Sequence, residues 1–248
     1  MKVSIITACY NSAKVITDCL ESVKNQDYKD IEHIVIDGLS NDNTLDIVKK
    51  YNPDILVSEK DGGLYQALNK GVGLATGDIV AFLHSDDVYY SCSTISNIVE
   101  AFKKSDADAV YSDLEYVSSE NINRCIRYWQ AGTFNLKKLR RGWMPPHPSF
   151  FVKRNVYQRA GNFNESYSIA ADYDFMMRVL NKEKISVYYL NETTVKMRVG
   201  GESNKSIKNL IRKSKEDYRA ARTNNVGGIT TVIFKNLRKI KQFILRQS

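Results

Sequence analysis

Two adjacent carboxylates, Asp86 and Asp87, come directly after the apolar run IVAFL at residues 79–83. Neighbouring acids at the end of a buried strand are costly unless a positive charge neutralises them. A divalent cation held by oxygen ligands fits such a site. Asp is also favoured at a helix start, and a helical run begins soon after, at Ser93. From the residues alone, a metal site and a helix cap are equally good interpretations.

A second acidic pair, Asp172 and Asp174, opens the segment DYDFMMRVL at residues 172–180, which has helical spacing of its apolar residues. Acids in the first turn are favoured by the helix dipole, which would explain the pair without any chemistry. The two alanines before Asp172 would instead set its carboxylate in a small, half-buried corner. A carboxylate held there can act as a general base.

His147 lies in the segment PPHP at residues 145–148, which cannot be helix interior. Its stiff backbone suits a ligand contact, although a lone histidine is more often structural. Asp61 precedes two glycines, and this turn could let a ligand approach the backbone or could be only a turn. The sequence has no GxxxxGK(S/T) motif, no GxGxxG after the first strand and no serine nucleophile elbow, so P-loop, dinucleotide-binding and hydrolase folds lack their fingerprints.

The segments that would position these residues alternate between strand and helix. Apolar runs predict strands at 3–6, 31–36, 55–57 and 79–83 and the start of another at 108–111, with helical spacing at 15–23, 45–48 and 65–75 between them. This order predicts an α/β fold with a mainly parallel sheet flanked by helices. Ligands of such sheets lie beyond the carboxyl ends of the strands. We therefore expect the chemistry at residues 7–11, 37–40, 59–63 and 84–87.

The composition is ordinary for a globular protein, with 43% hydrophobic and 26% charged residues in a chain of 248. No apolar run approaches the roughly 20 residues of a membrane span, and the N-terminus is not typical of a signal peptide. The four cysteines, Cys9, Cys19, Cys92 and Cys125, form no CxxC pair. This spacing indicates a reduced, cytosolic chain with buried thiols.

The net charge of +8 is concentrated at one end of the chain. Residues 205–248 carry 12 Lys or Arg and 2 acidic residues, a net of +10, which leaves −2 for residues 1–204. We therefore predict a main domain at 1–204, with halves at 1–110 and 111–204, and a basic helical tail at 205–248. A basic tail favours a polyanionic partner.

The end of the tail has the pattern of an amphipathic helix. Ile233, Leu237, Ile240 and Ile244 recur at helical spacing, with lysines and arginines elsewhere around the helix. Such a helix can lie in an anionic membrane interface, or it can pack on the main domain with a solvated basic face. No RNA- or DNA-binding motif accompanies the charge, so no nucleic acid partner is expected.

Seven segments, in order, resemble glycosyltransferase family 2, whose members have the Rossmann-like GT-A fold of nucleotide-diphospho-sugar transferases. They are IITACYN (5–11), LESVKNQ (20–26), VIDGLSNDNT (35–44), EKDGGLYQALNKG (59–71), ATGDIVAFLHSDD (75–87), MPPHPSFF (144–151) and ADYDF (171–175). The resemblance covers about residues 1–200, which would make residues 1–204 a GT-A catalytic domain.

The resemblance implies a role for each matching residue on the donor side. Ala8, Tyr10 and Asp37 would hold the nucleotide base and ribose, and Asp61 and Asn69 would line the same pocket. Asp86, helped by Asp87, would bind a Mg²⁺ or Mn²⁺ ion that bridges the diphosphate.

On the acceptor side, the resemblance makes Asp172 the base that deprotonates the acceptor hydroxyl, with His147 and Trp143 lining the acceptor. Three positions depart from the family's pattern. Ala8 replaces a usual proline, Ala171 replaces a common glutamate, and His84 stands where many relatives have the first acid of an Asp-x-Asp. His84 therefore shifts the main metal role to Asp86.

The implied function is a metal-dependent inverting transfer of a sugar from a UDP-sugar to a carbohydrate acceptor. That acceptor would be a lipid-linked glycan of bacterial O-antigen, capsule or exopolysaccharide synthesis, and the protein would be peripheral at the inner face of the cell membrane. A nucleotidyltransferase would need a basic Gly-rich loop near the first strand, and none is there. A catalytically silent sugar-nucleotide binder or assembly partner stays open as an alternative.

Overall fold

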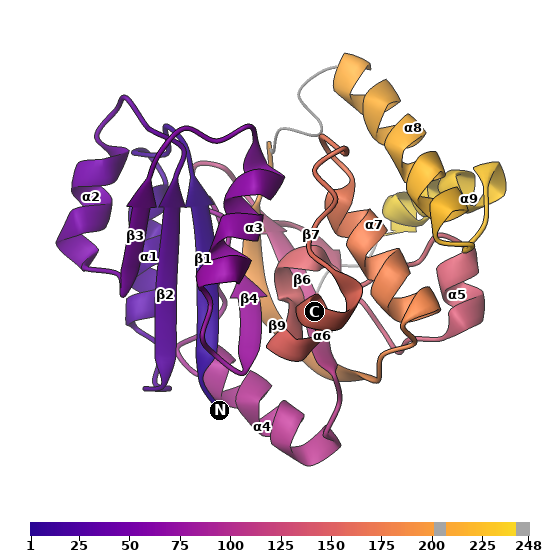
Figure 1. The fold of residues 1–248 in the computed structure, drawn as a ribbon, viewed down its shortest axis with the longest axis horizontal. Coiled ribbons are helices and arrows are strands. Elements are labelled where there is room, and N and C mark those ends of the chain that lie inside the picture. The colour runs from indigo at the N-terminus through magenta and orange to yellow at the C-terminus, as the bar shows by residue number, and fades with distance from the viewer. Residues whose placement is uncertain (201–206, 242–248) are drawn as a thin grey trace.

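The computed structural model describes residues 1–200 and 207–241. Its first half is a parallel sheet of β1 (Val3–Cys9), β2 (Ile31–Asp37), β3 (Ile55–Ser58) and β4 (Ile79–Phe82), in the order β3-β2-β1-β4 (Figure 1). All four residues of β4 are buried, as expected of a strand that is apolar on both faces. The predicted α/β architecture and the four parallel strands are confirmed.

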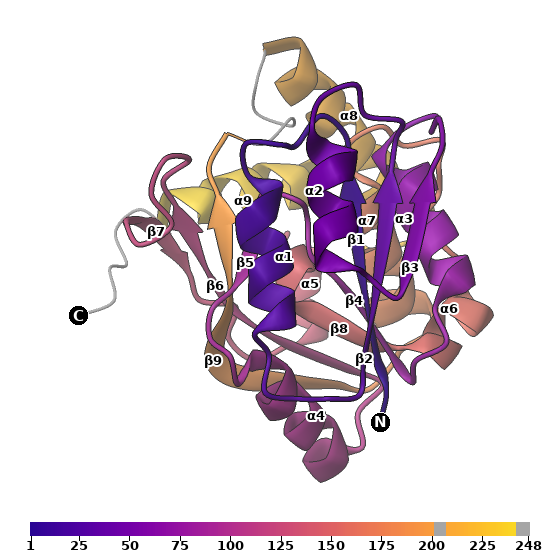
Figure 2. The same cartoon turned by 90° about the vertical axis from the view of Figure 1, so that its left-hand side faces the viewer.

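Helices cover both faces of this sheet because alternate strand residues point to opposite sides. On one face, Ile6 and Ile36 pack against α3 (Leu64–Leu74). On the other, Val35 packs against α1 (Ile16–Lys24) and α2 (Thr44–Tyr51), which lie in front in Figure 2. The helix α3 lies so close to β1 that a Cβ at Gly71 would come 2.3 Å from Ile6 Cγ2.

The second half extends the sheet with a different topology. From β4 the order continues β8-β6-β9-β5. The strand β7 pairs with the C-terminal part of β6, whereas β8 pairs with its N-terminal part. The pairs β4–β8, β6–β8, β5–β9 and β6–β7 are antiparallel, whereas β6 and β9 are parallel. The elements are β5 (Val88–Tyr89), α4 (Thr94–Ser105), β6 (Ala109–Val117), β7 (Cys125–Trp129), α5 (Leu136–Arg140), η1 (His147–Ser149), β8 (Phe150–Lys153), α6 (Arg154–Ala160), α7 (Ala171–Met177), η2 (Arg178–Lys182) and β9 (Val187–Arg198).

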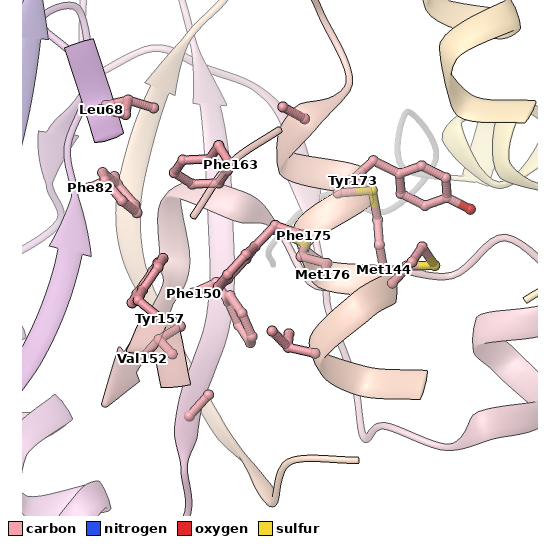
Figure 3. Close-up of a cluster of buried hydrophobic side chains, with 14 of the residues drawn as sticks. Leu68, Phe82, Met144, Phe150, Val152, Tyr157, Phe163, Tyr173, Phe175 and Met176 are labelled. Carbon is pink, nitrogen blue, oxygen red and sulfur yellow. The ribbon is translucent and has the colours of Figure 1, made fainter. Parts of the chain in front are cut away.

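An aromatic cluster joins the two halves and fixes α7 on the sheet (Figure 3). Phe82 of β4 lies 5.2 Å from Phe163, measured between ring centroids, and Phe163 lies 5.3 Å from Phe175 of α7. Tyr157 of α6 stacks on Phe175 at 4.7 Å. Buried aromatic side chains of this size dominate core energetics, so the position of α7 follows from this packing.

The last two helices, α8 (Ile207–Thr223) and α9 (Ile229–Lys241), pack on α7 and α5 (Figure 1). Asn224 is buried and donates to Asp174 Oδ1 at 2.8 Å. Thr231 donates to the Arg140 carbonyl at 2.9 Å. The tail therefore packs on the main domain along its described part, and Ile244 lies outside the described residues. The boundary predicted at residue 204 stays a prediction.

One expectation from sequence, that the cysteines are buried, needs adjustment. Cys92 and Cys125 are exposed, so the prediction of buried thiols is wrong for them, because one lies in the turn before α4 and the other on the outer strand β7. Cys9 and Cys19 are buried as expected. No helix within residues 1–200 and 207–241 is both long and apolar enough to span a bilayer.

Candidate active site

The carboxyl ends of β1, β2 and β3 bring the predicted nucleotide residues to one edge of the sheet. Tyr10 follows β1 with 62% of its surface exposed, and Ala8 is buried just before it. Asp37 ends β2 and is fully buried, where it accepts bonds from Ser40 N at 3.1 Å and Ser58 Oγ at 2.7 Å. Of these residues, Tyr10 is the one whose side chain is accessible to a ligand, whereas the buried Asp37 stabilises the loop after β2.

Asp61 lies at the same edge and contributes a carboxylate oxygen that lacks a partner. One oxygen accepts from Lys70 Nζ, which also pairs with Glu59 at 2.7 Å. The other, Oδ2, is buried and has no hydrogen bond among the described residues. A Cβ at Gly38 would come 3.7 Å from Asp61 Oδ2 and 3.5 Å from the Tyr10 ring, so these two predicted residues meet across Gly38. Buried polar atoms normally find partners, and a ligand at this edge would supply one.

Asn69 has a different place from the one expected. Its amide nitrogen donates to the Phe163 carbonyl at 2.9 Å and to Glu165 Oε1 at 2.8 Å, and its oxygen accepts from Phe163 N at 3.0 Å. Asn69 therefore ties α3 to the loop that leads into α7. Its predicted contact with the nucleotide stays a prediction.

The acidic pair after β4 separates into two environments. Asp87 is 1% exposed and its Oδ1 accepts from the backbone N–H of Arg198 at the end of β9, at 3.2 Å. Burial, and next the charge of Asp86, raise the pKa of Asp87 well above its ordinary value. Asp86 is half-buried, and within the described part of the chain no hydrogen bond or ion pair engages its carboxylate.

These two acids fit a divalent cation as a pair of oxygen ligands. Among residues 1–200 and 207–241, the Asp86 carboxylate has no protein partner, and the buried Oδ2 of Asp87 has none either. Hard cations such as Mg²⁺ and Mn²⁺ favour carboxylate oxygens, and Mg²⁺ in particular keeps few protein ligands besides substrate phosphates. The described residues contain no ready-made group of three or more metal-binding side chains. A cation here would therefore depend on its substrate for further ligands.

Asp172 lies in the first turn of α7, next to two histidines whose rings contact each other. His147 Nδ1 is 3.5 Å from Asp172 Oδ2, and His147 Nε2 is 3.0 Å from His84 Nε2. On the other side, the Tyr65 hydroxyl is within donating distance of two acceptors, the Ile169 carbonyl at 2.7 Å and Asp172 Oδ1 at 3.2 Å. The structure thus brings His84 and His147 from separate segments to the predicted base.

The charges around Asp172 favour its ionised form. Burial raises the pKa of Asp172, but protonated His147, Lys235 and the Tyr173 backbone N–H together outweigh burial and leave this pKa below its ordinary value. Burial lowers the pKa of His147 to about 4, although Asp172 opposes this effect. At neutral pH the pair therefore holds a negative Asp172 and a neutral His147. When both rings are neutral, one of the two Nε2 atoms of His84 and His147 carries the proton and the other accepts it.

The loop before α7 is held by the tail helix α8. Glu216 accepts from the backbone N–H groups of Ser168 at 3.1 Å, Ile169 at 2.8 Å and Ala170 at 3.0 Å. These N–H groups precede the first turn of α7, where donors lack partners within the helix. Glu216 therefore fixes the approach to Asp172 from outside the first 204 residues.

Trp143, expected on the acceptor side, is in the core. It is 6% exposed, its indole N–H donates to the Ala131 carbonyl at 2.8 Å, and its ring packs edge-on against Tyr111. This geometry gives Trp143 a supporting position, and its contact with an acceptor stays a prediction. His147 is half-buried beside Asp172, as a residue lining the acceptor would be.

Sequence reasoning gave no role to Tyr65 or Lys235. Tyr65 lies within the motif at 59–71, so that motif was the available signal. No sequence signal pointed to Lys235, because a lysine in a basic helix is expected to face solvent. It is instead 7% exposed, donates to Asp217 Oδ1 at 2.6 Å and lies 3.4 Å from the centroid of the Tyr173 ring.

Comparison with known sequences identifies relatives that match most of this chain. The sequence model of glycosyl transferase family 2 matches residues 4–183. The chain is 31% identical over 194 residues to a PGL/p-HBAD biosynthesis glycosyltransferase of Mycobacterium bovis, which covers 76% of this chain and 73% of that protein. It is also 29% identical to chondroitin synthase of Pasteurella multocida over an alignment of 224 residues. That alignment covers 87% of this chain and 22% of the synthase.

Solved structures with similar folds include two nucleotide-sugar complexes. S. aureus TarS in complex with UDP-GlcNAc gives a TM-score of 0.73 at 22% identity, over 91% of this chain and 66% of that one. The mannosyltransferase PcManGT from Pyrobaculum calidifontis, in complex with GDP-Man and Mn²⁺, gives 0.67 at 18% identity, over 98% of this chain and 72% of that one. At these identities the likeness concerns the fold, and it confirms the expected GT-A fold.

Proposed function

Because the chain belongs to glycosyltransferase family 2, we propose that it transfers a sugar from a UDP-sugar to a carbohydrate acceptor with inversion at the anomeric carbon. The observation that carries this proposal is the half-buried carboxylate of Asp172, which has the Tyr65 hydroxyl 3.2 Å from one oxygen and His147 Nδ1 3.5 Å from the other. The complexes of similar folds with UDP-GlcNAc and GDP-Man support a nucleotide-sugar as donor.

In the proposed step, Asp172 accepts the proton of an acceptor hydroxyl as the hydroxyl oxygen attacks the anomeric carbon. The bond from that carbon to the diphosphate oxygen breaks on the opposite face, and the electron pair leaves with the nucleoside diphosphate. A single displacement of this kind inverts the anomeric configuration. Tyr65 holds one oxygen of Asp172 while His147 faces the other, so the carboxylate keeps one orientation toward the acceptor.

Asp86, with Asp87, would hold Mn²⁺ or Mg²⁺ on the donor side. A bound cation would offset the charge that develops on the departing diphosphate. The free carboxylate of Asp86 supports its role as the main ligand. Tyr10 and Asp61, which meet across Gly38, would contact the base and ribose of the donor, above Asp37 and Ala8.

We further propose that the acceptor is a lipid-linked glycan of a bacterial surface polysaccharide, and that the protein works at the inner face of the membrane. One relative is named for PGL/p-HBAD biosynthesis and another is a chondroitin synthase, which supports a carbohydrate-containing acceptor. The basic charge of residues 205–248 supports an anionic surface near the site.

The test is release of nucleoside diphosphate from a panel of UDP- and GDP-sugars, with carbohydrate acceptors and with Mn²⁺, Mg²⁺ or EDTA. We expect release that depends on acceptor and metal, and product with inverted configuration by NMR. Retained configuration would contradict Asp172 as the single base. Donor binding without release for any pair would favour a catalytically silent sugar-nucleotide binder.

A further inference from the structure

The helix α9 has its polar side turned toward the protein. Thr231 and Lys235 are 1% and 7% exposed, and Lys235 pairs with the buried Asp217 of α8. The backbone of α9 lies so close to Gly142 that a Cβ there would come 2.4 Å from Lys235 N and Thr231 O. This contact and the buried pair fix which face of α9 looks inward.

The outward face of α9 is mainly apolar, although Thr230 and Asn236 are also exposed. Ile229, Ile233 and Leu237 follow one another at intervals of four residues and are 68%, 51% and 52% exposed, with Phe234 beside them at 48%. A helix on the surface of a water-soluble domain has the opposite arrangement, with its apolar stripe facing the core. Contiguous exposed apolar surface of this kind marks a site of interaction.

The apolar surface continues into a groove between α8 and α9. The groove has a volume of about 540 Å³. It is lined by Leu210, Ile211, Ser214, Lys215, Tyr218, Ile229 and Val232. Leu210, Ile211 and Tyr218 are themselves 44–54% exposed, so the apolar area spans both helices.

A row of basic side chains runs along α8 beside this groove. Lys208, Arg212, Lys215, Arg219 and Arg222 are all exposed. Their spacing of four and three residues in alternation places them on one side of the helix. Lys215 belongs to both the row and the groove, so positive charge borders the apolar surface. Arg219 also donates to Ser166 Oγ and stacks on Tyr167.

We propose that the outward face of α9, the groove and the basic row of α8 together form a docking surface for an anionic lipid bilayer. Apolar side chains would enter the interface while the α8 cations meet lipid phosphates. Nucleic acid would match the charge but leave the apolar face uncovered. A second copy joined about a two-fold axis would bring the basic rows together.

This inference deepens the proposed function and rests on it for the lipid-linked acceptor. Glu216 of α8 holds the loop before Asp172, so a bilayer bound at α8 lies next to the acceptor side of the site. In Figure 1, α8 and α9 both lie beyond α7, on the side away from α1 and α2. The helices that form the docking surface therefore lie on the opposite side of the fold from α1 and α2.

The test is co-sedimentation of the full chain, without donor, with vesicles of phosphatidylcholine alone or with phosphatidylglycerol added. We expect binding to the anionic vesicles that weakens as salt is raised. The variants Ile233→Ser with Leu237→Ser, and Arg212→Glu with Lys215→Glu, should each weaken binding about tenfold or more. All four side chains are exposed, so the fold should survive, as circular dichroism would check.

Matched controls change the same residue types on other faces. Lys103→Glu with Lys104→Glu on α4, and Leu74→Ser at the end of α3, should leave vesicle binding unchanged. No binding to anionic vesicles, equal binding to both compositions, or equal losses in the controls would overturn the docking surface. A dimer that the Ile233→Ser change dissolves would assign the surface to a second copy instead. Vesicle binding by a chain that transfers no sugar would keep the docking surface and reject the proposed function.

Discussion

The nucleotide edge and the surroundings of Asp172 both present acidic side chains, but they are assembled differently. Asp37 ends β2 and Asp86 follows β4, two parallel strands with only β1 between them, so the strand order brings both acids to one edge of the sheet. Asp172 is oriented by Tyr65, 107 residues earlier, and by a loop that Glu216 holds from the C-terminal helices. The proposed nucleotide edge thus depends on sheet topology, and the proposed base Asp172 depends on packing between distant segments.

The sharpest break between the two regions should come from Asp172→Asn. An amide of the same shape cannot accept the acceptor proton, so transfer should fall by about 10²–10⁴-fold. Donor binding by calorimetry should stay as in the wild type, because the nucleotide edge is untouched. The surface change Asp46→Asn serves as the control. Unchanged turnover would reject Asp172 as the base.

The C-terminal helices are held by a buried ion pair, so Lys235→Met should cause a large loss of stability. The change leaves Asp217, at 1% exposure, buried without its cation, which costs about 3–5 kcal/mol of unfolding free energy. Urea unfolding would measure it, and adding Asp217→Leu should restore much of the loss. Lys153→Met, which breaks the exposed pair with Asp106, should change little. Equal effects of the two single changes would refute this view of the C-terminal helices.

The two acids after β4 should behave unequally. Asp86→Asn should weaken metal-dependent donor binding by about 10²-fold, since it removes the free carboxylate. Asp87→Asn should cost less than about tenfold, because an amide oxygen can still accept from Arg198 N–H. Titration of donor with and without Mn²⁺ would separate them. Larger losses in Asp87→Asn would make Asp87 the main ligand.

The smallest effect on transfer should come from Tyr65→Phe. Loss of the hydroxyl near Asp172 Oδ1 should lower transfer about tenfold, the weight of one hydrogen bond to a charged group, with donor affinity preserved. Tyr51→Phe removes a hydroxyl bonded to Glu21 at the far side and should have no effect. A fall in donor affinity instead would place Tyr65 on the nucleotide side.

The same contrast explains what the sequence could predict. Strands 3–6, 31–36 and 79–83 were predictable because local apolar runs encode them and parallel topology then fixes their edge. The strands β7, β8 and β9 show no regular alternation of apolar and polar residues. All three pair with β6, and this shared pairing cannot be read from any one of their sequences. The meeting of His84 with His147 depends on tertiary packing that no local pattern encodes.

The clamp of Glu216 on residues 168–170 has a consequence for how far from a surface the enzyme can work. A flexible tether would let the catalytic domain sample a range of heights above whatever its end is bound to. Here three backbone hydrogen bonds join α8 directly to the loop that carries the base. In the proposed docking, the helix α8 would therefore act as a rigid spacer, and the fold rather than linker length would set the height at which a sugar is added.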